Sequence, residues 1–329
     1  MLSLAEAADR LRAIPGLELR ERERLAPYTR FGLGGEATLF CVTSSRAAFV
    51  EALNATATVA LPRMVIGGGT NLVVSDEGFD GIVLQFAGCK IEANGTKLTV
   101  EAGAVLQDVV DRSIELGLQG LQTMTGIPGF TGGAVYGNAG AYGHSINELV
   151  RRVDFVRDGR VASFDNTQCG FTYRHSRFKD HKEWVILSTE LQFERGDRNA
   201  LARTAAEIRA LRDAKYPPTM KCAGSIFKNV FFANLPPATQ ALIPPNLIRE
   251  GKVPSAFFLE QVGAKGIRRG DIQVATYHAN LIYNDGKSGR ASDLVAVIQE
   301  LKTRVRERFA FEIEEEVQYV GFDYAPVAS

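Results

Sequence analysis

The segment at residues 126–143 limits what this chain can fold into more than any other, because glycine recurs through it at short intervals. Glycine stands at Gly126, Gly129, Gly132, Gly133, Gly137, Gly140 and Gly143. Glycine removes side chains where the backbone must take positive φ or approach something closely, so that N–H groups can face a ligand. Apolar residues such as Ile127 and Phe130 would pack against the protein. We interpret this glycine-rich stretch as an ordered segment lining a phosphate-bearing ligand, with a long flexible loop as the alternative.

A second glycine cluster, Gly67-Gly68-Gly69-Thr70-Asn71, lies between two apolar runs that read as strands, 64–66 and 72–74. The dinucleotide fingerprint and the P-loop both open a helix, and neither pattern is present here. What remains is a turn whose successive N–H groups, with the Thr70 hydroxyl and the Asn71 amide, could hold a pyrophosphate. A tight β-turn without a ligand is the alternative.

Composition and charge exclude several classes of protein. The chain has 329 residues, 45% hydrophobic and 23% charged, which is typical of a globular protein of two or three domains. Its 38 basic and 38 acidic residues balance, so we expect no nucleic-acid or membrane partner. Residues 1–12 lack an apolar signal core and predict a surface helix. The cysteines and histidines show no ligand spacing, which predicts reduced thiols, no metal and a cytoplasmic location.

The hydrophobic pattern alternates short strands and helices along the chain. Strands are predicted at 37–43, 64–66, 72–74, 82–86, 97–103, 153–156, 185–193, 281–283 and 313–320. Helices are predicted from Ser44 or Ser45 to Leu53 and at 105–116, 200–212, 256–262 and 292–309. A domain boundary is expected near Gly196.

Several motifs in this order are similar to those of one family. They are Tyr28-Thr29-Arg30-Phe31-Gly32, 67–72, Gly126-Ile127-Pro128-Gly129, 138–143, Tyr173-Arg174-His175-Ser176, 223–229, His278-Ala279-Asn280 and Glu315-Glu316-Val317. Together they resemble the UDP-N-acetylenolpyruvoylglucosamine reductase (MurB) family of flavoenzymes, which act in peptidoglycan precursor synthesis.

The resemblance implies an α+β chain with a two-subdomain FAD-binding fold of the PCMH/vanillyl-alcohol-oxidase type, followed by a C-terminal α+β substrate-binding domain. The FAD-binding domain would span 1–196, with subdomains at roughly 20–86 and 87–196. The substrate domain would span 197–329, and its last strand would return near the flavin. One branch of the family carries a tyrosine-loop insert before the substrate domain. Here Phe193 leads through 194–197 directly into the helix at Ala200, so the chain resembles the shorter class.

The resemblance also implies the chemistry: NADPH reduces noncovalently bound FAD, which then reduces UDP-N-acetylenolpyruvoylglucosamine to UDP-N-acetylmuramate. The matched positions assign Arg174 and Glu316 to charge stabilisation and Ser225 to proton donation. Those expected to bind FAD are Gly67, Gly68, Gly69, Thr70, Asn71, Leu72, Thr125, Gly126, Ile127, Pro128, Gly133, Asn138, Gly140, Ala141 and Tyr142. Those expected near the UDP-sugar are Tyr173, Lys215, Asn229 and Gln261. Roles in cell wall biogenesis, cell shape, cell division and the cell cycle would follow.

Simpler interpretations of these residues stay open from sequence alone. Arg174 could be a surface arginine, Ser225 a turn residue, Glu316 an exposed strand residue and Lys215 a solvated helix end. The chain could also be another FAD-dependent oxidase or dehydrogenase of the same fold, a nucleotide-binding module without chemistry, or a structural protein. The visible spectrum of the purified protein would separate the first of these from the last two.

Overall fold

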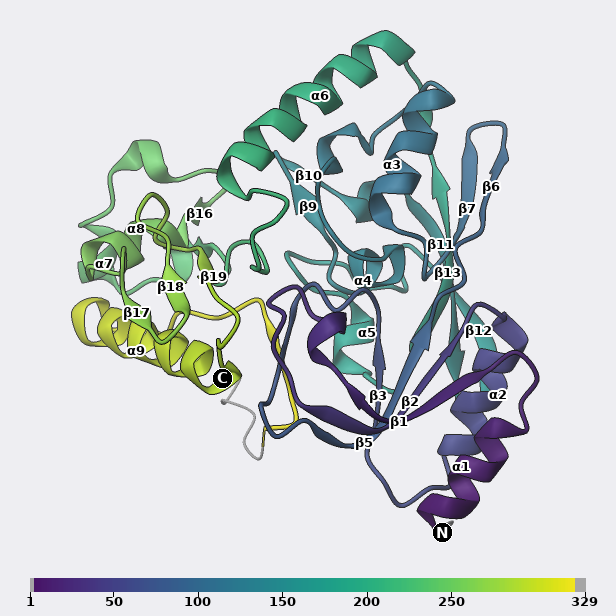
Figure 1. Cartoon of the computed structure of the whole chain (residues 1–329). Helices are drawn as coiled ribbons and strands as arrows, with labels where there is room; N and C mark the ends of the chain where they lie inside the picture. Colours follow the sequence, from purple (N-terminus) through teal and green to yellow (C-terminus); the bar gives the residue numbers. More distant parts are fainter. Residues whose placement is uncertain (1–2, 323–329) are drawn as a thin grey trace. The chain divides into compact units, whose positions relative to one another are not determined.

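The computed structural model describes residues 3–322, which form two compact units (Figure 1). The first unit holds residues up to Glu23, Ala37–Gly69 and Asp80–Pro217; the second holds Arg24–Glu36, Thr70–Phe79 and the described residues from Pro218. The boundary expected from the sequence falls earlier, at Gly196. The division into a cofactor domain and a substrate domain stays a prediction.

The N-terminal part of the first unit is a four-stranded sheet with helices packed on it. Its strand order is β1-β2-β5-β3, with β3 and β5 parallel. The elements are α1 (Leu4–Arg12), β1 (Glu18–Arg24), β2 (Glu36–Thr43), α2 (Arg46–Thr56), β3 (Arg63–Ile66) and β5 (Phe79–Phe86). Ser45 caps α2, as the sequence predicts, by accepting a hydrogen bond from the Ala48 N–H. The first two residues of the predicted N-terminal helix lie outside the described part of the chain.

A five-stranded antiparallel sheet, with strand order β12-β11-β13-β7-β6, makes the rest of the first unit. Its strands are β6 (Ile91–Asn94), β7 (Lys97–Glu101), β11 (Val150–Arg157), β12 (Arg160–Asp165) and β13 (Val185–Gln192). The helices α3 (Leu106–Glu115), α4 (Thr131–Tyr136), α5 (Arg177–Asp180) and α6 (Arg198–Lys215) and the 3₁₀ turn η2 (Gln122–Met124) also belong here. Side chains from both sheets join one core, in which Phe49 stacks on Phe86 at 5.1 Å between ring centroids.

The second unit brings together three separate parts of the sequence. Strand β20 (Gln318–Val320) pairs in parallel with β4 (Leu72–Val74). The other strands are β15 (Val230–Phe231), β16 (Lys252–Val253), β17 (Arg268–Arg269), β18 (Ile272–Val274) and β19 (Ile282–Asn284), and the helices are α7 (Pro237–Gln240), α8 (Ser255–Gln261) and α9 (Ala291–Phe309). The core includes Phe258, whose ring meets Phe309 and Phe311 edge to face. Burial of this apolar stripe explains why the period of residues 292–309 predicts α9 correctly.

Two predicted features differ from the structure. The predicted strand at 313–320 is regular only over Gln318–Val320, because its parallel partner β4 is three residues long. Upstream of it, Glu315 makes an isolated bridge with Phe227. The glycine-rich stretch, for which no helix was predicted, contains the helix α4, whose Ala134 and Val135 are buried.

Candidate functional site

The glycine loop at residues 67–72 joins β3 to β4, and the chain passes from the first unit to the second between Gly69 and Thr70. In the first unit, this loop packs on the glycine-rich stretch at backbone distance. A Cβ added to Gly68 would lie 3.2 Å from the Cα of Gly129 and 3.4 Å from the Phe130 ring. The Gln85 side chain donates to the Gly67 carbonyl at 2.8 Å. The two glycine motifs that the sequence singles out are therefore neighbours.

Helix α4 carries two adjacent glycines with opposite surroundings. A Cβ on Gly132 would come within 2.8 Å of the Ala102 Cβ, so packing requires glycine there. A Cβ on the exposed Gly133 would meet nothing within 4 Å. Alanine would favour this helix more than glycine does. The protein's own packing therefore gives no reason for glycine at 133, and the open backbone surface fits a large cofactor laid against α4.

Arg174 is the third of four residues in a tight turn whose ends, Thr172 and His175, are bridged. Its φ of 56° is in the left-handed region, which is uncommon for a residue other than glycine and often marks a functional position. Its Nη2 donates to the Gly140 carbonyl at 2.8 Å, and its guanidinium carbon lies 5.3 Å from the centre of the Tyr173 ring. These contacts fix the plane of the guanidinium.

The glycine-rich stretch holds both ends of this turn. The buried Asn138 donates to the Thr172 carbonyl at 2.8 Å, and the Ser176 hydroxyl donates to the Tyr136 carbonyl at 2.7 Å. Within the first unit, therefore, the structure brings the expected cofactor segments and the expected catalytic arginine into one connected network.

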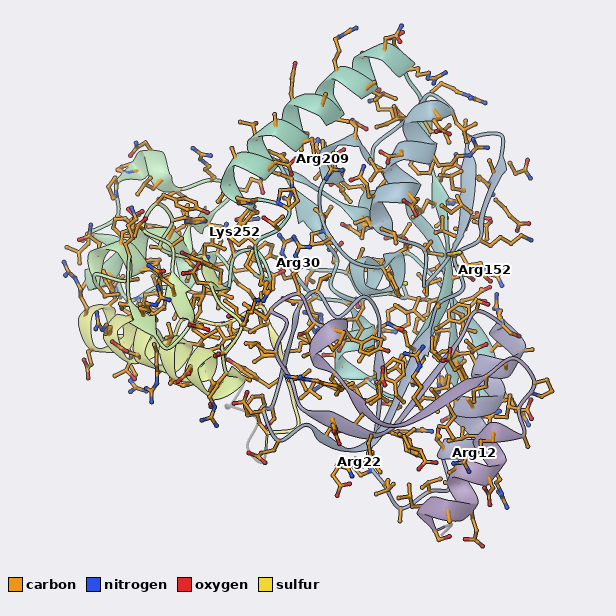
Figure 2. All side chains as sticks on the ribbon, in the orientation of Figure 1. Arg12, Arg22, Arg30, Arg152, Arg209 and Lys252 are labelled. Carbon is orange, nitrogen blue, oxygen red and sulfur yellow. The ribbon has the colours of Figure 1, made fainter. Side chains whose placement is uncertain are left out.

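An arginine that was not predicted from the sequence lies beside the same stretch. Arg212 of α6 lies against Gly126, where an added Cβ would be 3.1 Å from its Cδ and Nε. Its Nε is buried and has no hydrogen-bond partner in the structure. Burial lowers the pKa of Arg212, although Tyr142 and Tyr216 act in the opposite direction. Arg209, labelled in Figure 2, lies one helical turn earlier in α6, and its Nη1 would be 3.5 Å from the same added Cβ. Arginines at i and i+3 share a helix face, and this was the available signal.

In the second unit, the segment containing Ser225 is tied to the segment containing Glu316. The Glu316 N–H donates to the Ile226 carbonyl at 2.7 Å, and the Asn71 amide donates to the Glu316 carbonyl at 2.8 Å. The Asn71 amide, which was expected to bind the cofactor, thus donates one hydrogen bond to the protein backbone. Ser225 itself forms an isolated antiparallel β-bridge with Leu281 and is partly buried.

The two glutamates before Glu316 make ion pairs within the second unit. Glu314 pairs with Lys228. Glu315 pairs with Lys302 at 2.7 Å and accepts a hydrogen bond from the Tyr319 hydroxyl at 3.3 Å. Burial raises the pKa of Tyr319, and the charge of Glu315 adds to this rise. Glu314 and Glu315 therefore form ion pairs with lysines of the second unit.

The residues expected near the UDP-sugar lie in different places. Tyr173 adjoins Arg174, and Lys215, at the last position of α6, has its Nζ 5.1 Å from the Tyr216 ring centre. Asn229 accepts a hydrogen bond from the Ser255 N–H at 3.4 Å. Gln261, at the end of α8, accepts from Arg308 through both its carbonyl and its side chain. The structure gives Gln261 a helix-bracing contact; its role in substrate binding stays a prediction.

Among residues 3–322, no group of three or more histidine, cysteine, aspartate or glutamate side chains could hold a metal ion. No helix among the same residues is long and apolar enough to cross a bilayer.

Comparisons with known proteins cover nearly the whole chain. Residues 37–164 match a family described as FAD binding domain, and residues 216–320 match UDP-N-acetylenolpyruvoylglucosamine reductase, C-terminal domain. The UDP-N-acetylenolpyruvoylglucosamine reductase of Solibacter usitatus is 56% identical over 312 residues, 95% of this chain and 100% of that protein. That of Rubrobacter xylanophilus is 36% identical and covers 91% of this chain and 94% of its own length. The crystal structure of the Thermus caldophilus reductase has a TM-score of 0.72 at 28% identity, covering 92% of this chain and 98% of that one.

Proposed function

This chain belongs to the UDP-N-acetylenolpyruvoylglucosamine reductase (MurB) family, and from that premise we propose that Arg174, Ser225 and Glu316 carry out its reaction. The chain is an FAD-containing oxidoreductase that uses NADPH to reduce UDP-N-acetylenolpyruvoylglucosamine to UDP-N-acetylmuramate. Its fold is a PCMH-type FAD-binding fold followed by the family's C-terminal domain. We place this reaction in the cytoplasm, in the peptidoglycan synthesis on which cell wall biogenesis, cell shape and cell division depend.

When bound, FAD would supply hydride transfer between NADPH and the methylene carbon of the enolpyruvyl group. We assign Gly67, Gly68 and Gly69 and the glycine-rich stretch to holding it, because the open backbone surface at Gly133 fits such a group. Thr70, Asn71 and Leu72 complete the assignment from the second unit.

We assign Arg174 to the substrate carboxylate. Addition of a hydride to an enol ether builds negative charge on the adjacent carbon, which spreads onto the carboxylate, and a planar guanidinium stabilises such charge with paired N–H donors. The contacts of Arg174 with the Gly140 carbonyl and the Tyr173 ring would hold the guanidinium ready before the substrate arrives. A donor that needs no reorganisation gives more stabilisation in the transition state.

We assign Ser225 as the proton donor to the carbon next to the carboxylate, with Glu316 supporting the charge there. The observation that carries this pairing is the 2.7 Å hydrogen bond from the Glu316 N–H to the carbonyl of Ile226, the residue after Ser225. This hydrogen bond joins the segment that carries the Glu316 carboxylate to the segment that carries the Ser225 hydroxyl. A serine is a weak acid, so its efficiency depends on such positioning.

The UDP-sugar is assigned to Tyr173, Lys215, Asn229 and Gln261. Lys215 would bring a positive charge to the diphosphate, and the amides of Asn229 and Gln261 offer both donors and acceptors to it and to the sugar. We propose that the substrate domain begins near residue 197 and that the strand following Glu316 returns to the cofactor.

The experiment that tests the proton donor is Ser225→Ala in the FAD-loaded enzyme, followed by anaerobic stopped-flow absorbance. Reduction of FAD by NADPH should stay close to wild type, whereas reoxidation by the enolpyruvyl UDP-sugar should slow by about 10²–10⁴-fold. Ser75→Ala is the matched control, because this second-unit serine accepts a hydrogen bond from the Glu77 N–H. Equal slowing of both half-reactions would assign Ser225 to the shape of the pocket, and unchanged reoxidation would remove it from proton transfer.

A further inference from the structure

The segment 225–228 is held like a strand from both sides, although it belongs to no regular ladder. On one side the Glu316 N–H donates to the Ile226 carbonyl at 2.7 Å, and the Lys228 N–H donates to the Glu314 carbonyl at 2.9 Å. In an antiparallel pairing these groups point to one side, so the N–H and the carbonyl of Phe227 between them point to the other. Phe227 is 1% exposed, and its peptide groups therefore need partners within the protein.

The side chain of Asn280 supplies both partners. The Phe227 N–H donates to the Asn280 Oδ1 at 2.8 Å, and the Asn280 Nδ2 donates to the Phe227 carbonyl at 2.9 Å. The Asn280 main-chain carbonyl also accepts from the Ile226 N–H at 3.1 Å. Asn280 is 3% exposed, so these bonds are shielded from water.

A side chain is needed here because the main chain turns away. The Leu281 N–H donates to the His278 carbonyl at 3.1 Å, which closes a tight turn over residues 278–281. Because residues 278–280 belong to this turn, their backbone does not extend as a strand beside Phe227. The amide of Asn280 replaces the missing strand, since a primary amide offers the donor and acceptor that a peptide group would offer.

We propose that Asn280 is a positioning residue for proton transfer by Ser225, acting through the peptide of Phe227; this inference rests on the proton-donor role proposed for Ser225. Ser225 forms an antiparallel β-bridge with Leu281 and lies two residues before Phe227. Leu281 therefore holds the backbone at Ser225, and the Asn280 side chain holds it at Phe227. Without the amide, two buried backbone groups lose their partners, and the segment gains freedom to shift toward other donors and acceptors. Proton donation to carbon depends on the distance between the hydroxyl and that carbon, so it should be the step most sensitive to such a shift.

The first test is Asn280→Ala in the FAD-loaded enzyme, measured by the two half-reactions. Reoxidation by the enolpyruvyl UDP-sugar should slow by about 10–100-fold, and FAD reduction by NADPH should stay within about twofold of wild type. The matched control is Asn284→Ala, because Asn284 is a buried amide of the same unit that donates to the Phe31 carbonyl at 3.0 Å and accepts from the Gly286 N–H at 3.2 Å. It should lower the melting temperature comparably and leave reoxidation near wild type. Equal slowing in the control would assign the effect to general loss of stability and overturn the inference.

A double variant separates positioning from a broader structural role. If Asn280 acts through the Ser225 hydroxyl, Asn280→Ala should cause little further slowing of reoxidation in a Ser225→Ala background. The same fold-change in both backgrounds would overturn the inference while leaving the proton donor in place. If Ser225→Ala alone leaves reoxidation unchanged, the proton-donor role fails and the inference fails with it.

A second substitution covers the outcome in which Asn280→Ala does not fold. Asn280→Asp is isosteric and keeps the acceptor for the Phe227 N–H, while removing the donor to the Phe227 carbonyl. It should show the same selective slowing of reoxidation, lost again in the Ser225→Ala background. Wild-type reoxidation in Asn280→Asp would overturn the inference.

Discussion

Replacing Gly133 with alanine should change the apoprotein and the FAD complex in opposite directions. Gly133 lies within α4, and a Cβ there would meet no protein atom within 4 Å. Alanine therefore introduces no clash in the apoprotein and restricts the unfolded chain. If the open surface at Gly133 is covered by FAD, the added methyl group must instead displace the cofactor or push it away from the helix.

The magnitudes follow from these surroundings. Alanine is favoured over glycine in a helix by about 1 kcal/mol, which in a unit of this size raises the melting temperature by roughly 2–4 °C. A methyl group forced into a packed contact typically costs about 1–3 kcal/mol, which corresponds to a loss of FAD affinity of roughly 5–150-fold.

The assay is calorimetry of the apoprotein together with titration of FAD by flavin fluorescence. Gly132→Ala is the contrasting control, because its Cβ would lie 2.8 Å from the Ala102 Cβ and should destabilise the apoprotein itself. A Gly133→Ala protein with wild-type FAD affinity would show that the cofactor does not lie on α4. A destabilised Gly133→Ala apoprotein would refute the claim that the protein leaves room for a Cβ at this position of α4.

Three further substitutions test other parts of the structure. Arg174→Lys keeps the charge but loses the planar pair of donors, so steady-state turnover should fall at least about 100-fold while FAD stays bound; unchanged turnover would remove Arg174 from the site. Glu316→Gln should slow reoxidation by the UDP-sugar in stopped-flow and leave FAD affinity intact, and a loss confined to FAD binding would make Glu316 structural. Asp76→Asn should lower the free energy of unfolding by about 1 kcal/mol at pH 7, since this carboxylate accepts from the Ala291 and Ser292 N–H groups at 2.7 and 3.0 Å. Burial acts to raise the pKa of Asp76, but the hydrogen bonds from Ser292 and Ala291 outweigh it and the pKa is lowered, so this stabilisation should be lost as the pH falls below the usual aspartate pKa of about 3.9. Urea denaturation at several pH values measures it, and a stability difference that persists at the lowest pH would contradict the assignment.

Sequence periodicity predicts the elements whose one face is buried by the core. Residues 292–309 carry an apolar stripe, and α9 forms there with that stripe inside. Strand β1 was missed, because its sequence, Glu-Leu-Arg-Glu-Arg-Glu-Arg, has no apolar face. It lies at the edge of the four-stranded sheet, where charged residues are common and prevent pairing with other chains.

The site divides in a similar way. The glycine motifs can be found in the sequence because their backbone geometry demands glycine, whereas Arg174 was identified through the family resemblance of its motif. The contacts of Asn280 and Arg212 could not be found in this way, although Asn280 stands in a matched motif and Arg212 shares a helix face with Arg209. The role of Asn280 depends on a contact with Phe227, 53 positions away, and that of Arg212 on its approach to a glycine in another element.

The parallel pairing of β4 with β20 also sets an order for biosynthesis. Asn71 and Glu316, joined by a hydrogen bond beside this pair, are 245 positions apart in the sequence. At a synthesis rate of about 5–20 residues per second, β4 waits roughly 10–50 s on the ribosome before its partner strand is made. During this interval the β4 residues Val73 and Val74, each 1% exposed in the folded chain, lack the neighbour that covers them. The pairing of β4 can therefore be completed only after Val320 has been synthesised, so that premature termination before Gln318 yields a chain whose β4 lacks β20 as its strand partner.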